Sequence, residues 1–503
     1  MKSRFLMLLM AITLWAALAI PLRLAAQDRQ EHKHKHHHYK LIDLGTLGGP
    51  QSYGDAGHGA ANINNRGTAV GVADTATPDP NYPNFNPLML PFGPDPFIFH
   101  VFRSRGNAIV DLGALPGANS SAASWISSSG LIVGQSITGA IDPLTGWLEE
   151  NAVLWKDDQI INLGTLGGYE SGAAFVNSRG QVVGFSGNGV PDPNSLLGLG
   201  TETRAFLWQD GKMQDLGTLG GPDAFAIFVN ERGQVTGMSY PGLSPGPPGC
   251  FPLATDAFLW EKGQMVDLGT LGGTCTFPNG INNRGQIVGQ SNLADDAETH
   301  AFLWEKGTMA DLGTLGGTFG SANSINEAGE VAGGATTAGD QAFHAFFWRR
   351  GALTDIGTVP GLDCSNAFAI NSQSQVVGQA FDCNGNLPGH AFLWENGHII
   401  DLNVFVPRGS NLILGDSEKL NDRGEIFGSA LLPNGDVHAF LLIPCDENHS
   451  GVEGCDYSMV GVPAIKARVS PAVRESSSRA LPPSFLRGMS RYRFPGRAFD
   501  PRN

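Results

Sequence analysis

One seven-residue string, Asp-Leu-Gly-Thr-Leu-Gly-Gly, constrains this chain more than any other feature, because it recurs along most of the sequence. Intact copies begin at Asp43, Asp215, Asp267 and Asp311, and altered copies begin at Asp111, Asn162, Asp355 and Asp401. Recurrence at 44 to 53 residues, with one longer first spacing of 68 residues, indicates a repeat architecture in which each repeat is one supersecondary unit. Any fold for this chain must therefore be built from eight similar units.

Two further strings recur in step with the first. One is typified by Ile-Asn-Asn-Arg-Gly-Gln-Ile-Val-Gly at 281–289, and its Asn or Ser stands at 64, 127, 177, 230, 282, 326, 371 and 421. The other is His-Ala-Phe-Leu-Trp or a variant, and it begins at His100, Asn151, Arg204, Asp256, His300, His344, His390 and His438. Each string occurs eight times, always in the same order.

The three ordered strings resemble the HAF-repeat family of bacterial extracellular proteins, whose name-giving string stands here at His300-Ala301-Phe302 and again at 344–346, 390–392 and 438–440. The resemblance covers residues 40 to 443. It implies an exported repeat protein and brings no activity with it. Three units have Asn151, Arg204 or Asp256 in place of the His, so the resemblance does not give that His a shared chemical role.

The residue pattern predicts four short strands per unit. From the His column to the next Asp-Leu-Gly, seven units have the same fourteen-residue length, as in His300 to Gly313, with a turn such as Glu305-Lys306-Gly307 at the centre. A constant length indicates a hairpin whose register is set by its turn. In the Asn string, Asn and Gly supply a second turn. Two hairpins per unit match the blade of an all-β propeller.

The phase of the repeats predicts how the ring closes. The first element after the N-terminal segments is a lone fourth strand from Tyr39 to Leu44, and the last unit ends at 440–442 without one. We expect the N-terminal strand to complete the last of about eight four-stranded blades, which leaves no open sheet edge. The alternative is a β-solenoid, which requires capping units at its ends.

Outside the repeats the chain divides into four segments. Residues 1–26 have the basic start, apolar core and small-residue end of a signal peptide. A linker at 27–39 holds five histidines, at 32, 34 and 36–38, which can take up transition metals weakly, although nothing predicts a defined metal site. A Cys-containing extension at 444–460 and a basic tail at 461–503, expected to be disordered, follow the repeats at 40–443.

Charge and cysteine content narrow the cellular setting. The formal charge is −15, and the body is near −25 once the basic signal peptide and tail are set aside, so nucleic acid is not an expected partner. We expect a secreted monomer without a membrane span. Six cysteines in an exported chain predict three disulfides. The expected pairs are Cys250–Cys275, Cys364–Cys383 and Cys445–Cys455.

The longest insertions mark where a site should lie. They fall in the first four units, at about 73–99, 136–150, 186–203 and 239–255, all on one face of the predicted ring. The preferred hypothesis is a non-enzymatic binding or adhesion scaffold, without cofactor or catalytic residues, that holds an extracellular carbohydrate, peptide or surface protein. Its expected contact residues are Tyr82, Phe85, Phe92, Trp147 and Tyr240.

The alternative hypothesis is an extracellular hydrolase or lyase that acts on polysaccharide. Its candidate acids are Asp79, Asp95, Asp142 and Glu149, which lie in the same insertions. The Gly-Thr-Leu-Gly-Gly loops lack the Lys-Ser/Thr of a phosphate-binding loop and are interpreted as structural turns. The recurring Asp is interpreted as a hydrogen-bonding group that every outer hairpin needs.

Overall fold

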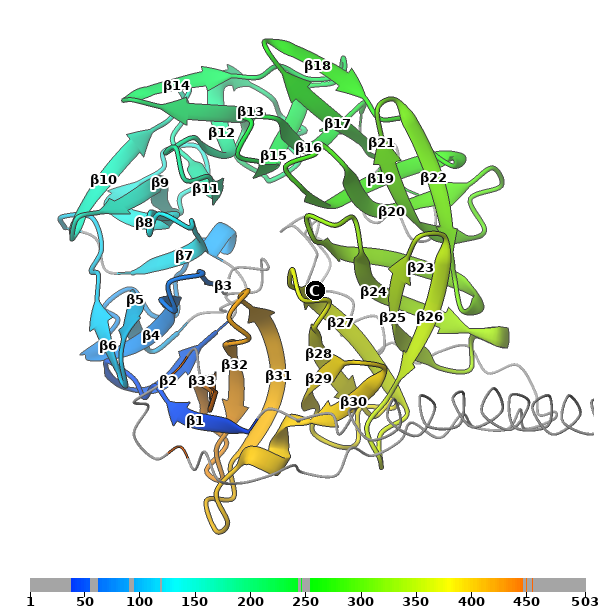
Figure 1. The fold of residues 1–503 in the computed structure, drawn as a ribbon. Coiled ribbons are helices and arrows are strands. Elements are labelled where there is room, and N and C mark those ends of the chain that lie inside the picture. Colours follow the sequence, from blue (N-terminus) through cyan, green and yellow to red (C-terminus); the bar gives the residue numbers. More distant parts are fainter. Residues whose placement is uncertain are drawn as a thin grey trace, which may run out of the picture.

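A computed structural model describes residues 38–54, 62–89, 95–117, 120–242 and 254–446, together with the single positions 246, 449 and 455. These residues form antiparallel strands and three short 3-10 helices, with no α-helix among them. The strands are grouped into eight blades around a central axis, as Figure 1 shows. The predicted all-β propeller is therefore confirmed, and the solenoid alternative is not.

The first four blades each run outward from an inner strand. Blade one consists of β2 (Gly48–Tyr53), β3 (Asn62–Ile63), β4 (Ala69–Pro78), β5 (Phe97–Arg105) and β6 (Ala108–Asp111). Blade two consists of β7 (Ser121–Ile126), β8 (Ile132–Ile141), β9 (Leu148–Lys156) and β10 (Gln159–Gly164). Blade three consists of β11 (Ser171–Val176), β12 (Val182–Pro191), β13 (Thr201–Gln209) and β14 (Lys212–Asp215). Blade four consists of β15 (Asp223–Val229), β16 (Val235–Tyr240), β17 (Asp256–Glu261) and β18 (Gln264–Asp267).

The next three blades repeat this order, and the eighth departs from it. Blade five consists of β19 (Gly272–Ile281), β20 (Ile287–Leu293), β21 (Thr299–Glu305) and β22 (Thr308–Gly313). Blade six consists of β23 (Gly316–Ile325), β24 (Val331–Thr337), β25 (Phe343–Arg349) and β26 (Ala352–Gly357). Blade seven consists of β27 (Cys364–Ile370), β28 (Val376–Phe381), β29 (His390–Glu395) and β30 (His398–Asp401). Blade eight consists of β31 (Ile413–Leu420), β32 (Ile426–Leu431), β33 (Val437–Pro444) and β1 (Tyr39–Asp43). The 3-10 helices are η1 (Pro87–Met89), η2 (Ala338–Asp340) and η3 (Leu402–Phe405).

The N-terminal strand closes the ring, as the repeat phase predicts. β1 pairs antiparallel with β33, from Tyr39 opposite Pro444 to Asp43 opposite Phe440. Blade eight then packs on blade one, because Leu441 of β33 and Ala69 of β4 belong to one buried cluster. Both sheet edges that an open array would expose are thereby removed.

The hydrophobic core lies between neighbouring blades. The Phe of the His-Ala-Phe string is completely buried in seven blades, at Phe102, Phe206, Phe258, Phe302, Phe346, Phe392 and Phe440. Each interface mixes side chains of two blades, as where Val288 of blade five meets Phe346 of blade six. The Gly of the Ile-Val-Gly string is needed for a close approach, since a Cβ on Gly289 would stand 1.8 Å from the Phe277 carbonyl oxygen.

Several sequence predictions fall on residues outside the described ranges. These are the signal peptide, nearly all of the His-rich linker, Phe92, Cys250 and the basic tail. Among the described residues, no helix is long and apolar enough to cross a membrane.

Candidate functional site

The meander sorts the connections of each blade onto two faces. The Asn turns and the Glu-Lys-Gly turns lie on one face, and the connections between hairpins and between blades lie on the other, which we name the loop face. On the loop face of blade one, the β4–β5 connection spans 79–96 and contains η1. A functional site is therefore expected on the loop face of blades one to four, which have the long insertions.

The aromatic residues predicted to bind a ligand do not form one exposed surface. Tyr82 is 53% exposed and Phe85 is half-buried, but Tyr240 is only 4% exposed. Tyr240 and the partly buried Trp147 pack with Leu88 of η1 in one apolar cluster. The insertions of different blades bury their aromatic side chains against each other, so the prediction is wrong for Tyr240 as a surface contact, and Trp147 serves mainly in packing.

The His column and the Asp column form a repeated structural pair. In five blades the His Nδ1 lies 2.8–3.1 Å from a carboxylate oxygen of the Asp column. The pairs are His100–Asp111, His300–Asp311, His344–Asp355, His390–Asp401 and His438–Asp43. The same Asp commonly accepts a backbone N–H two residues later, as from Gly313 at 2.7 Å. The predicted hydrogen-bonding role of the Asp is therefore present.

The Asn column forms a second repeated element, which links blades. Asn282 Oδ1 accepts the backbone N–H groups of its own turn, while Nδ2 donates to the Asn326 carbonyl of the next blade at 3.1 Å. Equivalent bonds span seven of the eight junctions in the described ring, including Asn421 to Asn64 at 2.9 Å. Ser127 interrupts the series at the junction of blades two and three. We name this series the Asn belt.

Repetition separates scaffold residues from candidate site residues, because a group that every blade contains serves the blade. Asp74 is a singular carboxylate in its column on the second strand. The other seven residues of that column are Ile137, Gly187, Tyr240, Asn292, Thr336, Phe381 and Leu431. Glu150 is singular in the column just before the His string. The other residues there are Phe99, Thr203, Thr255, Thr299, Phe343, Gly389 and Val437.

Asp74 belongs to a group of carboxylates on the loop face of blade one. It is 1% exposed, and its Oδ2 accepts the Gln51 N–H at 3.1 Å. Burial first, and then the charges of Asp95 and Asp436, raise the pKa of Asp74 to about 7. Because of this pKa, a large fraction of Asp74 carries a proton at neutral pH.

Asp95 is the neighbouring acid of the same loop and is half-buried. Burial and then the charge of Asp79 raise its pKa above the usual range, while a hydrogen bond from the Phe97 N–H at 2.8 Å opposes the rise. Asp79 is held near Asp95 by its own N–H, which donates to the Pro96 carbonyl at 2.9 Å. The structure thus brings together two of the acids that the sequence singled out, and it adds Asp74, which the sequence reasoning missed.

Asp142 and Glu149 lie on the loop face of blade two, in a second acidic group with Glu150 and Glu170. Asp142 opens its connection with an Asx turn, in which its Oδ1 accepts the Leu144 N–H at 2.7 Å. Asp79 and Asp192 make the same turn in blades one and three. The turn geometry of Asp142 is therefore a shared scaffold feature of the long connections.

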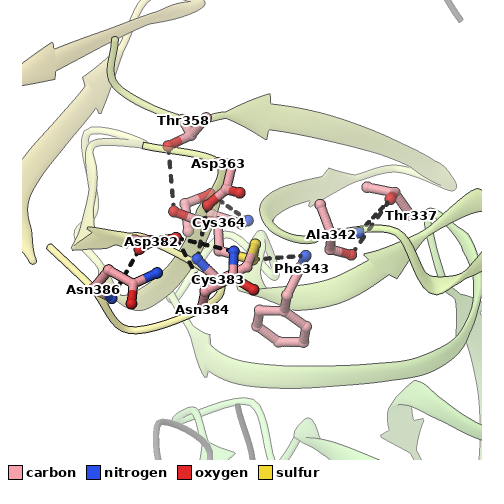
Figure 2. Close-up of a disulfide and its surroundings, with 12 residues drawn as sticks. Thr337, Ala342, Phe343, Thr358, Asp363, Cys364, Asp382, Cys383, Asn384 and Asn386 are labelled. Carbon is pink, nitrogen blue, oxygen red and sulfur yellow. Dashed lines mark hydrogen bonds between the residues drawn. A yellow bond between two sulfur atoms is a disulfide. The ribbon is translucent and has the colours of Figure 1, made fainter. Parts of the chain in front are cut away.

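Two of the predicted disulfides, Cys364–Cys383 and Cys445–Cys455, are present, and Cys275 is also disulfide-bonded. Figure 2 shows Cys364–Cys383 beside Asp363, whose carboxylate accepts the Cys383 N–H at 2.7 Å. Among the described residues, Asp363 and these two cysteines are the one group of three potential metal ligands already within 4.8 Å of one another. Because both sulfurs are in the disulfide bond, this group is a covalent staple between two loops of the loop face.

Comparison with known proteins finds a likeness to solved β-propeller structures and gives no family. No family model and no curated protein matches the chain. A solved structure that matches is the β-propeller domain of the Trilobed protease from Pyrococcus furiosus, with 10% identity, a TM-score of 0.42, and coverage of 71% of this chain and 99% of that one.

Two other matches are whole peptidases. A puromycin-hydrolysing peptidase of Mycobacterium tuberculosis has 13% identity and a TM-score of 0.40, and the match covers 78% of this chain and 61% of that one. The acylaminoacyl peptidase of Pyrococcus horikoshii has 9% identity and a TM-score of 0.40, with coverage of 73% and 55%. This chain thus spans only part of the length of these two peptidases.

The expectation of a non-enzymatic binding or adhesion scaffold is corrected: the three solved structures named above are a propeller domain of a protease and two peptidases. The burial of Tyr240 also removes part of the aromatic surface on which that expectation depended. Identities of 9–13% concern the fold alone and assign no chemistry to this chain.

Proposed function

We propose that this chain is an exported hydrolase that cleaves glycosidic bonds of a polysaccharide, with Asp74 and Asp95 as its catalytic carboxylates. The observation that carries the proposal is the pKa of about 7 at Asp74, on the loop face of blade one and coupled to a second acid. Glycoside hydrolysis uses a pair of carboxyl groups, one of which must hold a proton near the working pH.

The two acids have different roles in this proposal. Asp74 donates its proton to the glycosidic oxygen as the bond to the anomeric carbon breaks. Asp95, which is more accessible, acts in its ionised form on the anomeric carbon, either directly or through a water molecule. Two carboxyl groups whose surroundings shift their pKa values by different amounts are suited to such a division of labour.

The charge of the site favours a neutral polysaccharide. Asp74, Asp79, Asp95 and Asp436 contribute only negative charge to one another's surroundings. A lyase that eliminates across a uronic acid must bring the substrate carboxylate into the site, where these acids would repel it. We therefore propose hydrolysis rather than elimination.

Sugar contacts are proposed for the exposed aromatic residues of the same connection. The Tyr82 N–H donates to the Asp79 carbonyl at 3.2 Å, which keeps Tyr82 close to the acids, and Phe85 follows three residues later. Aromatic rings offer an apolar face and, in Tyr, a polar edge to a sugar ring. Export is supported by the signal-peptide pattern and by the disulfides, since disulfides persist in oxidising compartments.

We also propose membership of the HAF-repeat family. It is supported by the repeated structural role of the name-giving His, which pairs with the Asp column in five blades.

The test is a reducing-end assay of the full chain on neutral and uronic-acid polysaccharides. We expect activity on a neutral polymer that falls as the pH rises through about 7, and a loss of at least 100-fold in Asp74→Asn. The matched control is Asp223→Asn. Asp223 is a buried acid at the start of blade four whose pKa is also raised by burial, and its Oδ1 accepts the Thr203 N–H of blade three at 2.8 Å.

Hydrolysis by the control but not by Asp74→Asn or Asp95→Asn supports the proposal. Unsaturated products from a uronic-acid polymer, or full activity in folded Asp74→Asn, would show that the assignment is wrong.

A further inference from the structure

Three carboxylates on the loop face of blades two and three are buried together. Glu150 lies in β9 opposite Ile137 of β8 and is 0% exposed, while Asp142 and Glu170 are each 1% exposed. We name these three residues the blade-two carboxylates. They lie apart from the Asp74–Asp95 pair in the sequence and belong to blades two and three, whereas Asp74 and Asp95 belong to blade one.

Few hydrogen bonds reach the blade-two carboxylates. Glu170 Oε2 accepts the Glu150 N–H at 2.9 Å and the Asn86 amide at 3.1 Å, and Asp142 Oδ1 accepts the Leu144 N–H. Four further oxygens have no hydrogen-bond partner in the structure. They are Asp142 Oδ2, Glu150 Oε1, Glu150 Oε2 and Glu170 Oε1. Both oxygens of the completely buried Glu150 are thus unpartnered.

Burying these three carboxylates in ionised form lowers the stability of the folded protein unless a positive charge compensates them. None of the ion pairs formed among the described residues involves a blade-two carboxylate. Burying an ionised carboxylate without a partner costs several kcal/mol. Accordingly, burial and then the charge of Glu170 raise the pKa of Glu150, and burial contributes most to raising that of Glu170 to about 8.

The position of Glu150 shows that the blade itself does not require the charge. The equivalent residues of the other blades are Phe, Thr, Gly or Val, which pack there without a carboxylate. Glu170, in contrast, has a repeated task. It caps the Glu150 N–H as Asp223 caps the Thr203 N–H and Ser120 caps that of Phe99. Glu150 is therefore the one charged residue in its column, and its carboxylate has no task in holding the blade together. A bound ligand would explain its presence.

We infer that Asp142, Glu150 and Glu170 bind a divalent cation of the Ca²⁺ type. Ca²⁺ takes six to eight oxygen ligands from carboxylates, amides and carbonyls, and its site tolerates irregular geometry. The oxygens of the three residues do not all lie within 4.8 Å of one another, so the cation must draw them together against their mutual repulsion. The unpartnered oxygens supply ligands from two blades.

The cation would also organise the insertion of blade one. Asn86, immediately before η1, donates its amide to Glu170 and to the Leu148 carbonyl at 2.8 Å, and Gln135 of β8 donates to the Leu88 carbonyl at 3.1 Å. The connection that carries Asp79 and Asp95 thus has its middle anchored at the blade-two carboxylates. Drawing Glu170 toward a cation stiffens that anchor.

The experiment measures binding without using activity. The full chain is freed of metals with a chelator, and its melting temperature is followed during titration with Ca²⁺ and, separately, Mg²⁺. We expect a rise of about 2–4 °C at millimolar Ca²⁺, smaller with Mg²⁺, which demands stricter geometry. Tb³⁺ should show sensitised luminescence, because Trp147 is adjacent: its carbonyl accepts the Asp142 N–H at 2.9 Å.

Matched variants locate the site. Glu150→Gln and Glu170→Gln should each abolish the Ca²⁺-dependent rise and lower Tb³⁺ affinity at least tenfold, whereas Asp223→Asn should retain both. Trp147→Phe should lose the luminescence and keep the Ca²⁺-dependent rise. If the wild-type melting temperature ignores Ca²⁺ between pH 6 and 8, the carboxylates are merely protonated and the inference is wrong. A Ca²⁺ response that persists in Glu150→Gln also overturns it. Neither outcome would contradict the hydrolase proposal, because that proposal is tested with substitutions of Asp74 and Asp95.

Discussion

The Asn belt makes ring closure measurable with one pair of substitutions. Asn282 lies at an internal junction, and Asn421 lies at the junction where blade eight meets blade one. Their bonds correspond one to one. Nδ2 donates across the junction at 3.1 Å in Asn282 and 2.9 Å in Asn421, and Oδ1 accepts two backbone N–H groups of the turn at 3.0–3.1 Å. Each Nδ2 also donates to the side chain four residues later. Replacing either residue by Ala removes the same four bonds.

The expected cost is about 3–4 kcal/mol for each variant, from about 1 kcal/mol per hydrogen bond. For a ring of roughly 400 residues, an unfolding entropy of about 2.1 cal/mol/K per residue gives about 0.85 kcal/mol per kelvin. The melting temperature should therefore fall by about 4 °C in Asn282→Ala and by the same amount in Asn421→Ala.

Differential scanning calorimetry on the wild type and both variants is the assay. The comparison depends on the closed ring, because in an open array the bond from Asn421 to Asn64 would not form. An open array would cost Asn421→Ala three bonds instead of four, so a fall that is smaller than that of Asn282→Ala by about 1 °C or more would refute closure between blades eight and one.

Four other outcomes follow from the structure. Deleting residues 39–47 removes β1 and should cause aggregation or a fall of more than 10 °C in melting temperature; an unchanged melting curve would argue against a closing strand. Ser127→Asn supplies the donor that the Asn belt lacks and should raise stability by about 1 kcal/mol in calorimetry, with no gain if the side chain turns to solvent. In the His438–Asp43 pair, the pKa of the imidazole is raised and that of the carboxyl is lowered, so the pair stabilises the fold between the two values. The benefit is lost as pH rises through the raised His pKa or falls through the lowered Asp pKa, and His438→Ala should cost about 0.5–1 kcal/mol near pH 5.5 and almost nothing at pH 9. Asp74→Asn should stabilise the protein above pH 7, because a carboxyl whose folded pKa is raised disfavours folding at pH values above its ordinary pKa. A shift to about 7 corresponds to about 4 kcal/mol at most, and solvent screening reduces this to about 1–2 kcal/mol; a destabilised variant at pH 8 would contradict the reasoning.

The architecture could be predicted because its causes are local and repeated. The turn string occurs eight times and the fixed hairpin length seven times in the sequence, which determines the number of blades. The single strand at Tyr39 determines how the ring closes. The pairing of Cys364 with Cys383 followed from the same map of loops. The cross-blade bond of Asn282 was missed, since a turn residue reveals its second hydrogen bond only once the neighbouring blade is in place.

The candidate site was predicted only in part, because it depends on how insertions pack. Asp79 and Asp95 were predicted from their place in a long connection. Asp74 was missed because it lies in a regular strand of the repeat, β4, where no insertion draws attention to it. Tyr240 looked available in the sequence, yet the loops of neighbouring blades bury it. Irregular loops have no repeat register, so nothing in the sequence indicates which side chains they cover.

Aligning the units by column would have found both acidic groups, and the reason is energetic. A blade accepts an uncharged side chain where the loop face meets the core, and seven of eight units have one at the position of Asp74 and seven of eight at that of Glu150. A carboxylate there costs stability through burial, as the raised pKa values of both residues indicate. Seven blades fold with an uncharged residue at each position, so the eighth blade does not need the acid for its structure. The two departures are therefore best explained by tasks that the ring itself does not impose: proton donation at Asp74, and cation binding at Glu150.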